Sequence, residues 1–124
     1  MENLEQIRAK NALAQAPGCG KGEGGDCLSG YPGLIINNGL LACLAFSLEK
    51  EDQNLSVANA IARHLHDLNI CRSETGKPDA ATLLRHLGGA TATSHTLRRA
   101  TDEALAFLGY LKRFVKSTAQ EKSP

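Results

Sequence analysis

The sequence is poor in the residues that build β-sheets and large aromatic cores. Its 124 residues include three Phe, two Tyr and no Trp. β-Branched residues are also few, and no segment alternates apolar and polar residues over the length of a strand. Leu and Ala must therefore fill most of the core. These absences predict an all-α fold, which we expect to be a compact single-domain bundle of five to six helices.

Long hydrophobic runs are missing as well. The most apolar segment, Pro32–Leu48, is interrupted by polar residues, and its longest unbroken apolar run is Leu40–Phe46. A membrane span needs about 20 such residues. The N-terminal segment Met1–Lys10 is charged and amphipathic, unlike a signal peptide. We therefore expect a cytoplasmic protein, and a chain of this length can bury a core without disulfides.

The four cysteines and four histidines show no spacing that is typical of a metal site. Neither C-x-x-C nor H-x-x-x-H occurs. His64 and His66 are two residues apart, so on a helix they point about 160° away from each other and cannot bind one ion. Cys19 and Cys27 could close a small loop, but a reducing compartment disfavours that disulfide. We predict no metal and no cofactor.

Motifs for nucleotide binding and catalysis are incomplete. Residues 20–25 match G-x-G-x-x-G formally, but a helix and Pro17 precede them where a dinucleotide site needs a strand. A Walker-type phosphate loop fails because Lys21 is followed by Gly22. Sequence positions suggest no grouping of Ser, His and Asp for nucleophilic catalysis. We predict that the protein is not an enzyme.

Pro32–Leu48 carries apolar side chains on every face of a helical projection, which predicts a helix buried in the core. Pro32 suits the first helical turn. The triplet Asn37, Asn38 and Gly39 interrupts the apolar pattern, and glycine in a helix interior costs about 1 kcal/mol relative to alanine. Two interpretations remain open: close intramolecular packing with the amides bonded to loops, which we favour, or a contact with a neighbouring subunit.

The other elements are expected to surround this central apolar helix. Within a domain of residues 1–117, we expect further helices at 2–16, 55–71, 79–87 and 94–117. Asp79 is a good N-cap for the third of these, and Gly88-Gly89 ends it. The Gly-rich segment 17–30 is expected to be a mobile loop, because glycine loses the most backbone entropy on folding. Residues 118–124 should form a flexible polar tail.

Charge is divided unevenly along the chain. The net charge is +1. Residues 1–62 hold four Lys and Arg against seven Asp and Glu, whereas residues 63–124 hold ten against six. A basic half can meet a polyanion, although charge alone does not prove such contact.

The last predicted helix places its cations on the flank opposite its apolar face. These cations are Arg98, Lys112, Arg113 and Lys116. Arg98–Asp102 and Arg99–Glu103 are expected to form ion pairs, because residues four apart are neighbours on a helix. Lys112, Arg113 and Lys116 have no acid within one turn, so their charge is available to phosphates. The alternative is that they only complement the helix dipole.

Two stretches of the chain match a pair of sequence motifs. The first runs from Tyr31-Pro32-Gly33-Leu34-Ile35 through Asn38-Gly39-Leu40 to Leu44-Ala45-Phe46 and is similar to P-x-L-I-x-x-N-G-L…L-A-F. The second runs from Ala100 to Phe114 and is similar to A-T-x-E-A-L-x-F-L-x-W-L-K-R-F. Together these stretches resemble the small subunit of type III-B (Cmr) CRISPR effector complexes. Arg8-Ala9 and Ala12-Leu13 resemble the family's opening helix. Tyr110 stands where the family usually has Trp, and the segment 18–30 matches no motif.

The resemblance implies a non-catalytic helical subunit of an RNA-guided complex in antiviral defence. In that family, copies stack beside the backbone subunits and line the groove where guide RNA pairs with target RNA. The implied partners are other subunits of the effector complex, further copies of this chain, guide RNA and target RNA. A generic helical protein–protein adaptor without nucleic-acid contact is the alternative.

Overall fold

Six helices make up the computed structural model, which describes residues 3–19, 24–50, 53–70, 78–89 and 92–121, without the side chains of 24–27 and 116–121. They are α1 (Leu4–Cys19), α2 (Gly24–Asn38), α3 (Leu40–Lys50), α4 (Gln53–Asp67), α5 (Ala80–Leu87) and α6 (Ser94–Glu121). No strand occurs in these described ranges. The predicted all-α fold is confirmed.

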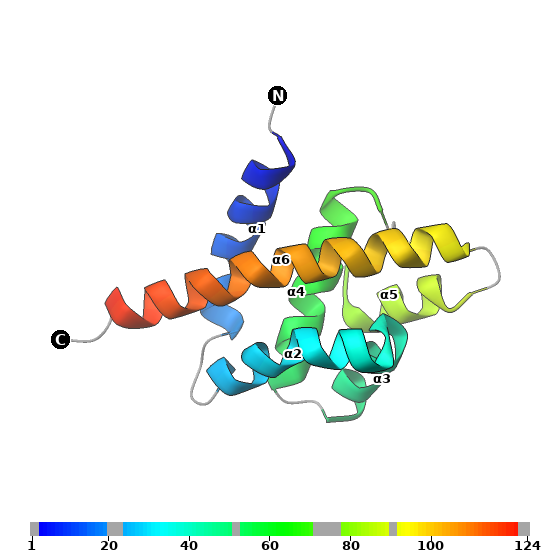
Figure 1. Cartoon of the computed structure of the whole chain (residues 1–124), viewed down its shortest axis with the longest axis horizontal. Helices are drawn as coiled ribbons and strands as arrows, with labels where there is room; N and C mark the ends of the chain where they lie inside the picture. The colour runs from blue at the N-terminus through cyan, green and yellow to red at the C-terminus, as the bar shows by residue number, and fades with distance from the viewer. Residues whose placement is uncertain (1–2, 20–23, 51–52, 71–77, 90–91, 122–124) are drawn as a thin grey trace.

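The long helix α6 spans the molecule, and Figure 1 shows α4 crossing behind it at a steep angle. α1 and α2 each pack against α6 and α4, and α5 packs against α3 and α4. α4 contacts all five other helices. Its buried residues include Ala58, Ala60 and Ala62, whose small side chains let neighbouring backbones approach from several sides. The helix at the centre of this fold is therefore α4.

The single central helix predicted over Pro32–Leu48 is wrong, because the chain breaks at Gly39. Gly39 has a φ of 92°, a left-handed conformation that glycine adopts without the penalty of a Cβ atom. Its amide donates to the Ile35 carbonyl at 2.8 Å, which ends α2, and α3 begins at the next residue. The two helices then pack against each other, and the Tyr31 hydroxyl lies 2.8 Å from Ser47 Oγ in the core. The apolar residues on all faces of Pro32–Leu48 therefore belong to two short helices and not to one long buried helix.

The Gly-rich segment differs from the predicted loop over 17–30. α1 continues through Pro17 to Cys19, and α2 already begins at Gly24, while residues 20–23 lie outside the described part of the chain. Leu28 and Tyr31 are fully buried and hold the first half of α2 against the core. The apolar surface that these two side chains remove from water offsets the entropy cost of ordering the neighbouring glycines.

The predicted boundaries in the second half of the chain are closer to the structure. Asp79 is the N-cap of α5, where its Oδ1 accepts from the Thr82 amide at 2.8 Å. The periodicity of α6 predicts one apolar face, and six of its eight residues are buried: Ala100, Ala104, Phe107, Leu108, Leu111 and Val115. The other two, Leu97 and Phe114, are partly buried against the core. α6 extends to Glu121, so residues 118–121 are helical where a flexible tail was expected. Over the ranges described, none of the helices is long and apolar enough to cross a bilayer.

Candidate nucleic-acid interface

The C-terminal half of α6 presents two of the four predicted RNA-binding cations. Arg113 is exposed, and Lys112 is half-buried, a degree of burial at which lysine commonly keeps its ammonium group in water. No ion pair involves either side chain in the part of the chain that is described. The side chain of Lys116 lies outside the described residues. These two cations therefore keep their charge for an external anion.

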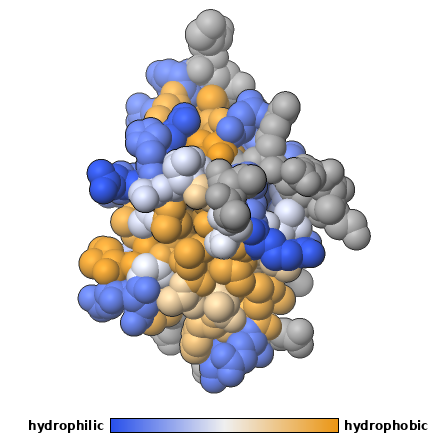
Figure 2. Space-filling view, turned by 90° about the vertical axis from the view of Figure 1, so that its right-hand side faces the viewer, coloured by the Kyte–Doolittle hydropathy of each residue, from blue (hydrophilic) through white to orange (hydrophobic). Residues whose placement is uncertain are grey.

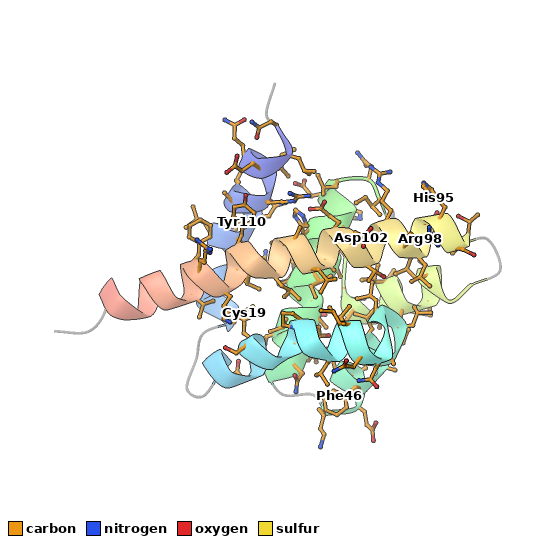
Figure 3. All side chains as sticks on the ribbon, viewed as in Figure 1. Cys19, Phe46, His95, Arg98, Asp102 and Tyr110 are labelled. Carbon is orange, nitrogen blue, oxygen red and sulfur yellow. The ribbon has the colours of Figure 1, made fainter. Side chains whose placement is uncertain are left out.

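Arg98 lies about 21 Å away along α6, because 14 residues at a rise of about 1.5 Å separate it from Lys112. It lines a pocket of about 280 Å³ between α1 and α6, whose walls are Arg8, His95, Arg98, Arg99, Asp102 and Glu103. Figure 3 shows His95, Arg98 and Asp102 following one another along this half of the helix. Arg98 shares the flank of Lys112 and Arg113 in projection, but it belongs to a separate cationic site.

Neither ion pair that was predicted for this half of α6 is formed. Glu103 is buried, with 7% of its surface exposed, and both its oxygens accept from Arg8 of α1: Oε2 from Nε at 2.7 Å and Oε1 from Nη2 at 2.8 Å. Glu103, the expected partner of Arg99, therefore pairs instead with Arg8, which lies 95 positions before it in the chain. Among the residues described, no ion pair joins Arg98 to Asp102. The pocket thus holds two guanidinium groups without a carboxylate partner.

His64 completes a buried network beneath the same pocket. Its Nε2 lies 2.9 Å from Glu103 Oε2, and its Nδ1 lies 2.9 Å from Asn11 Nδ2. Because Asn11 Nδ2 also donates to Asp67, this amide nitrogen is the donor to Nδ1, and His64 donates from Nε2 to Glu103. The imidazole stacks on Phe107, with ring centroids 4.3 Å apart. This arrangement holds His64 in its neutral form.

Burial and hydrogen bonding set the pKa values in this network. Burial lowers the pKa of His64 below its ordinary value and outweighs the opposing effect of Glu103. Burial alone would raise the pKa of Glu103, but hydrogen bonds from Arg8 and His64 outweigh it and lower the value. The hydrogen bond to Glu103 raises the pKa of Arg8. Arg8 and Glu103 are therefore a charged pair beside a neutral imidazole.

Sequence reasoning missed this network, although one signal for it was present. Glu103 lies within about 60° of Ala100 and Phe107 on the helical projection, inside the apolar face of α6. An acid at such a position needs a buried partner. The identity of Arg8 and His64 as partners depends on how α1 and α4 pack against α6, which local spacing does not reveal.

The possible subunit contact at Asn37, Asn38 and Gly39 is an exposed corner between α2 and α3. A Cβ atom added at Gly39 would meet nothing within 4 Å, so close packing of another backbone is not the reason for this glycine. The favoured intramolecular interpretation, with buried amides, is therefore wrong. Beside the corner, Ile36 is 71% exposed and Phe46 is 38% exposed. Asn38 and Phe46 also line a pocket of about 350 Å³ together with Leu34, Ala42 and Cys43.

Hydrophobic residues are not confined to the core. Figure 2 shows them gathered across the side of the molecule that carries α5, the α2–α3 corner and the start of α6. In Figure 3, Phe46 projects from the outer side of α3. Apolar surface that gathers in this way commonly marks a protein–protein contact.

Cysteines and histidines do not assemble into a metal site in the ranges that the structure describes. No group of three or more His, Cys, Asp or Glu side chains there could hold an ion. Cys19 and Cys43 are buried, and burial raises the pKa of the Cys43 thiol. Cys27 and Cys71 lie outside the described side chains, so the pairing of Cys19 with Cys27 stays a sequence-based alternative.

Comparison with models of known protein families shows to which family the chain belongs. The family model for a CRISPR-associated protein, Cas_Cmr5, matches residues 4–118. The chain belongs to this family. No curated protein and no solved structure matches it. Membership in Cas_Cmr5, the small-subunit family of type III-B complexes, confirms the resemblance carried by the two motifs and indicates a subunit of the Cmr complex that associates with other Cmr subunits.

Proposed function

We propose that this Cmr subunit is a non-catalytic, single-domain structural component that bridges backbone subunits and lines the groove holding guide RNA and target RNA, acting in the cytoplasm in antiviral defence. The family match over residues 4–118 carries the proposal. It is supported by exposed cations on α6 that no carboxylate neutralises in the described part of the chain. Contacts of this kind would hold the RNA backbone without reading its sequence.

Four cations are assigned to RNA. Lys112, Arg113 and Lys116 would approach one stretch of phosphates, and Arg98 would contact another about 21 Å along the helix. Arg99 and His95 line the same pocket as Arg98 and strengthen this second contact. Each contact supplies little affinity by itself, so binding depends on many copies acting on one RNA.

The α2–α3 corner is assigned to a neighbouring protein subunit. Asn37, Asn38 and Gly39 are exposed there, and Ile36 and Phe46 add apolar surface that water solvates poorly. The same surface supports the alternative function, a helical adaptor that binds proteins without contacting nucleic acid.

Co-purification tests the proposed function. A tagged chain expressed with the other Cmr subunits should carry them and a guide RNA through purification, as detected by mass spectrometry and RNA sequencing. Ile36→Ser with Phe46→Ser should leave helicity intact by circular dichroism but reduce recovery of the partners, whereas the exposed apolar pair Leu4→Ser with Leu13→Ser serves as a matched control. Recovery of the protein partners without RNA would favour the adaptor. Recovery of no Cmr subunit would contradict both assignments.

A further inference from the structure

A second pocket between α1 and α6 lies on the cationic flank of α6, apart from the one that Arg98 lines. It has a volume of about 440 Å³ and is lined by Glu5, Ala106, Gly109, Tyr110 and Arg113. This volume falls in the range of small-ligand sites. Figure 3 shows Tyr110 rising from α6 close to α1.

The pocket has a flat aromatic wall beside a floor almost without side chains. Tyr110 is half-buried and packs against the hydrophobic core. Its neighbour Gly109 is exposed, and a Cβ atom added there would meet nothing within 4 Å. Ala106, one turn earlier, adds only a methyl group. An open slot therefore runs along one helix beside an aromatic ring.

The polar groups around this slot complement a nucleotide. Arg113 is exposed, carries no ion pair in the described ranges and can bind a phosphate at the rim. Glu5, from the first turn of α1, can only accept hydrogen bonds when ionised. It would pair with an exocyclic amino group, as carboxylates do with cytosine N4.

We propose that this pocket binds one unstacked RNA base against Tyr110, with the adjoining phosphate on Arg113. Aromatic side chains stack single bases in this way in many RNA-binding proteins. A base with an amino group is preferred over uracil, because Glu5 then gains a donor. This inference rests on the proposed RNA contact of α6 and adds a base-stacking site to its phosphate contacts.

Ligand binding in this pocket can be followed with a spectroscopic label on tyrosine. The chain has two Tyr, and Tyr31 is fully buried and bonded to Ser47. In the full-length chain labelled with 3-fluorotyrosine, one fluorine signal reports on Tyr110 and the other is an internal reference. The probes are three RNA hexamers of equal charge: cytidine, uridine and an abasic ribose-phosphate chain.

The cytidine hexamer should shift the Tyr110 signal and bind about tenfold more tightly than the abasic hexamer. Uridine should fall between them, and Tyr31 should not respond. Gly109→Leu fills the slot and should reduce cytidine binding to the abasic level. Gly33→Leu, at another exposed helical glycine with open space around it, is the matched control and should bind like the parent.

The opposing results separate this inference from the proposed function. Equal binding of all three hexamers, with salt dependence, would leave the phosphate contacts standing and overturn the base pocket. Absence of binding by every hexamer would overturn the base pocket, whereas the phosphate contacts of the assembled complex, which need many copies, would stand or fall by the titration of that complex. A Tyr110 signal that moves only when backbone subunits are added would assign the pocket to a protein side chain and also overturn the inference.

Discussion

At the scale of single residues, the most constrained part of this protein is the network of Arg8, Glu103 and His64. One buried carboxylate accepts three hydrogen bonds from two side chains on different helices. The network joins α1, α4 and α6, and Phe107 covers one face of the imidazole. Burial costs each charge of the ion pair its hydration, so the pair adds less to stability than its short distances suggest.

Removal of the shared carboxylate should be severe. Glu103→Ala leaves Arg8 and His64 without their partner, and we expect it to lower the free energy of unfolding by about 3 kcal/mol. This lies at the lower end for a buried pair because 23% of the Arg8 side chain is exposed. Asp102→Ala, the adjacent exposed acid, is the matched control and should change the value by less than about 0.5 kcal/mol. Urea unfolding measures both, and equal effects would show that the network does not stabilise the fold.

The neutral state of His64 predicts a loss of stability in mild acid. Its folded pKa lies below the ordinary value of 6.5, so below pH 6.5 the unfolded chain binds a proton that the folded chain does not. The free energy of unfolding should therefore be constant above about pH 7 and decrease as the pH falls below 6.5. A further decrease should follow below pH 4.5 as Glu103 is protonated, because its folded pKa is also lowered.

His64→Gln provides the comparison for this pH dependence. Its amide can still donate to Glu103 but does not titrate, so most of the decrease between pH 7.5 and pH 5.5 should disappear. Urea unfolding at these two pH values measures the difference. A parent protein that becomes more stable at pH 5.5 would mean that His64 is charged in the fold.

At the scale of helices, periodicity predicted some elements well and others poorly. The apolar face of α6 and the Asp79 cap of α5 follow from local spacing and local hydrogen bonding, so the sequence alone was sufficient. The break at Gly39 was read as a glycine inside a helix, because apolar segments lie on both sides of the triplet Asn37, Asn38 and Gly39. The central position of α4 was also missed, since its alanines pack with helices that are remote in sequence.

Gly39 should be sensitive to any side chain for a conformational reason. Gly39→Ala should cost about 1–2 kcal/mol, because residues with a Cβ atom are strained at a φ of 92°. Gly39→Leu should cost nearly the same, since space around this position is open. Thermal unfolding of both variants tests the point. A leucine variant that is much less stable than the alanine variant would indicate overpacking against a neighbouring element instead.

At the scale of the whole molecule, the candidate site is only partly visible in the sequence. Exposure of Arg98 and Arg113 followed from their position opposite the apolar face of α6, whereas Lys112 on the same flank is half-buried. The presence of two separate pockets, one around Arg98 and one around Tyr110, could not be predicted from the sequence, because α1 forms a wall of both. The exposed α2–α3 corner likewise appeared only once the helices were placed, and it turned a suspected packing contact into a candidate docking surface.

The central claim is that α6 contacts RNA phosphates within the Cmr complex. Its most direct test is a titration of labelled target RNA into reconstituted complexes over a range of salt concentrations. One complex carries the parent chain and a second carries Lys112→Glu with Arg113→Glu. A third carries Arg63→Glu with Arg85→Glu, exposed cations on α4 and α5 that match the change in charge.

We expect the α6 variant to bind target RNA more weakly at low salt and to approach the parent at high salt. The slope of log K against log salt should become shallower by about 0.7–0.9 for each phosphate that the variant no longer neutralises. The complex with the α4 and α5 changes should behave like the parent. If all three complexes have equal affinities at low salt and equal slopes over the range of salt concentrations, the claim is contradicted and the adaptor is the better account.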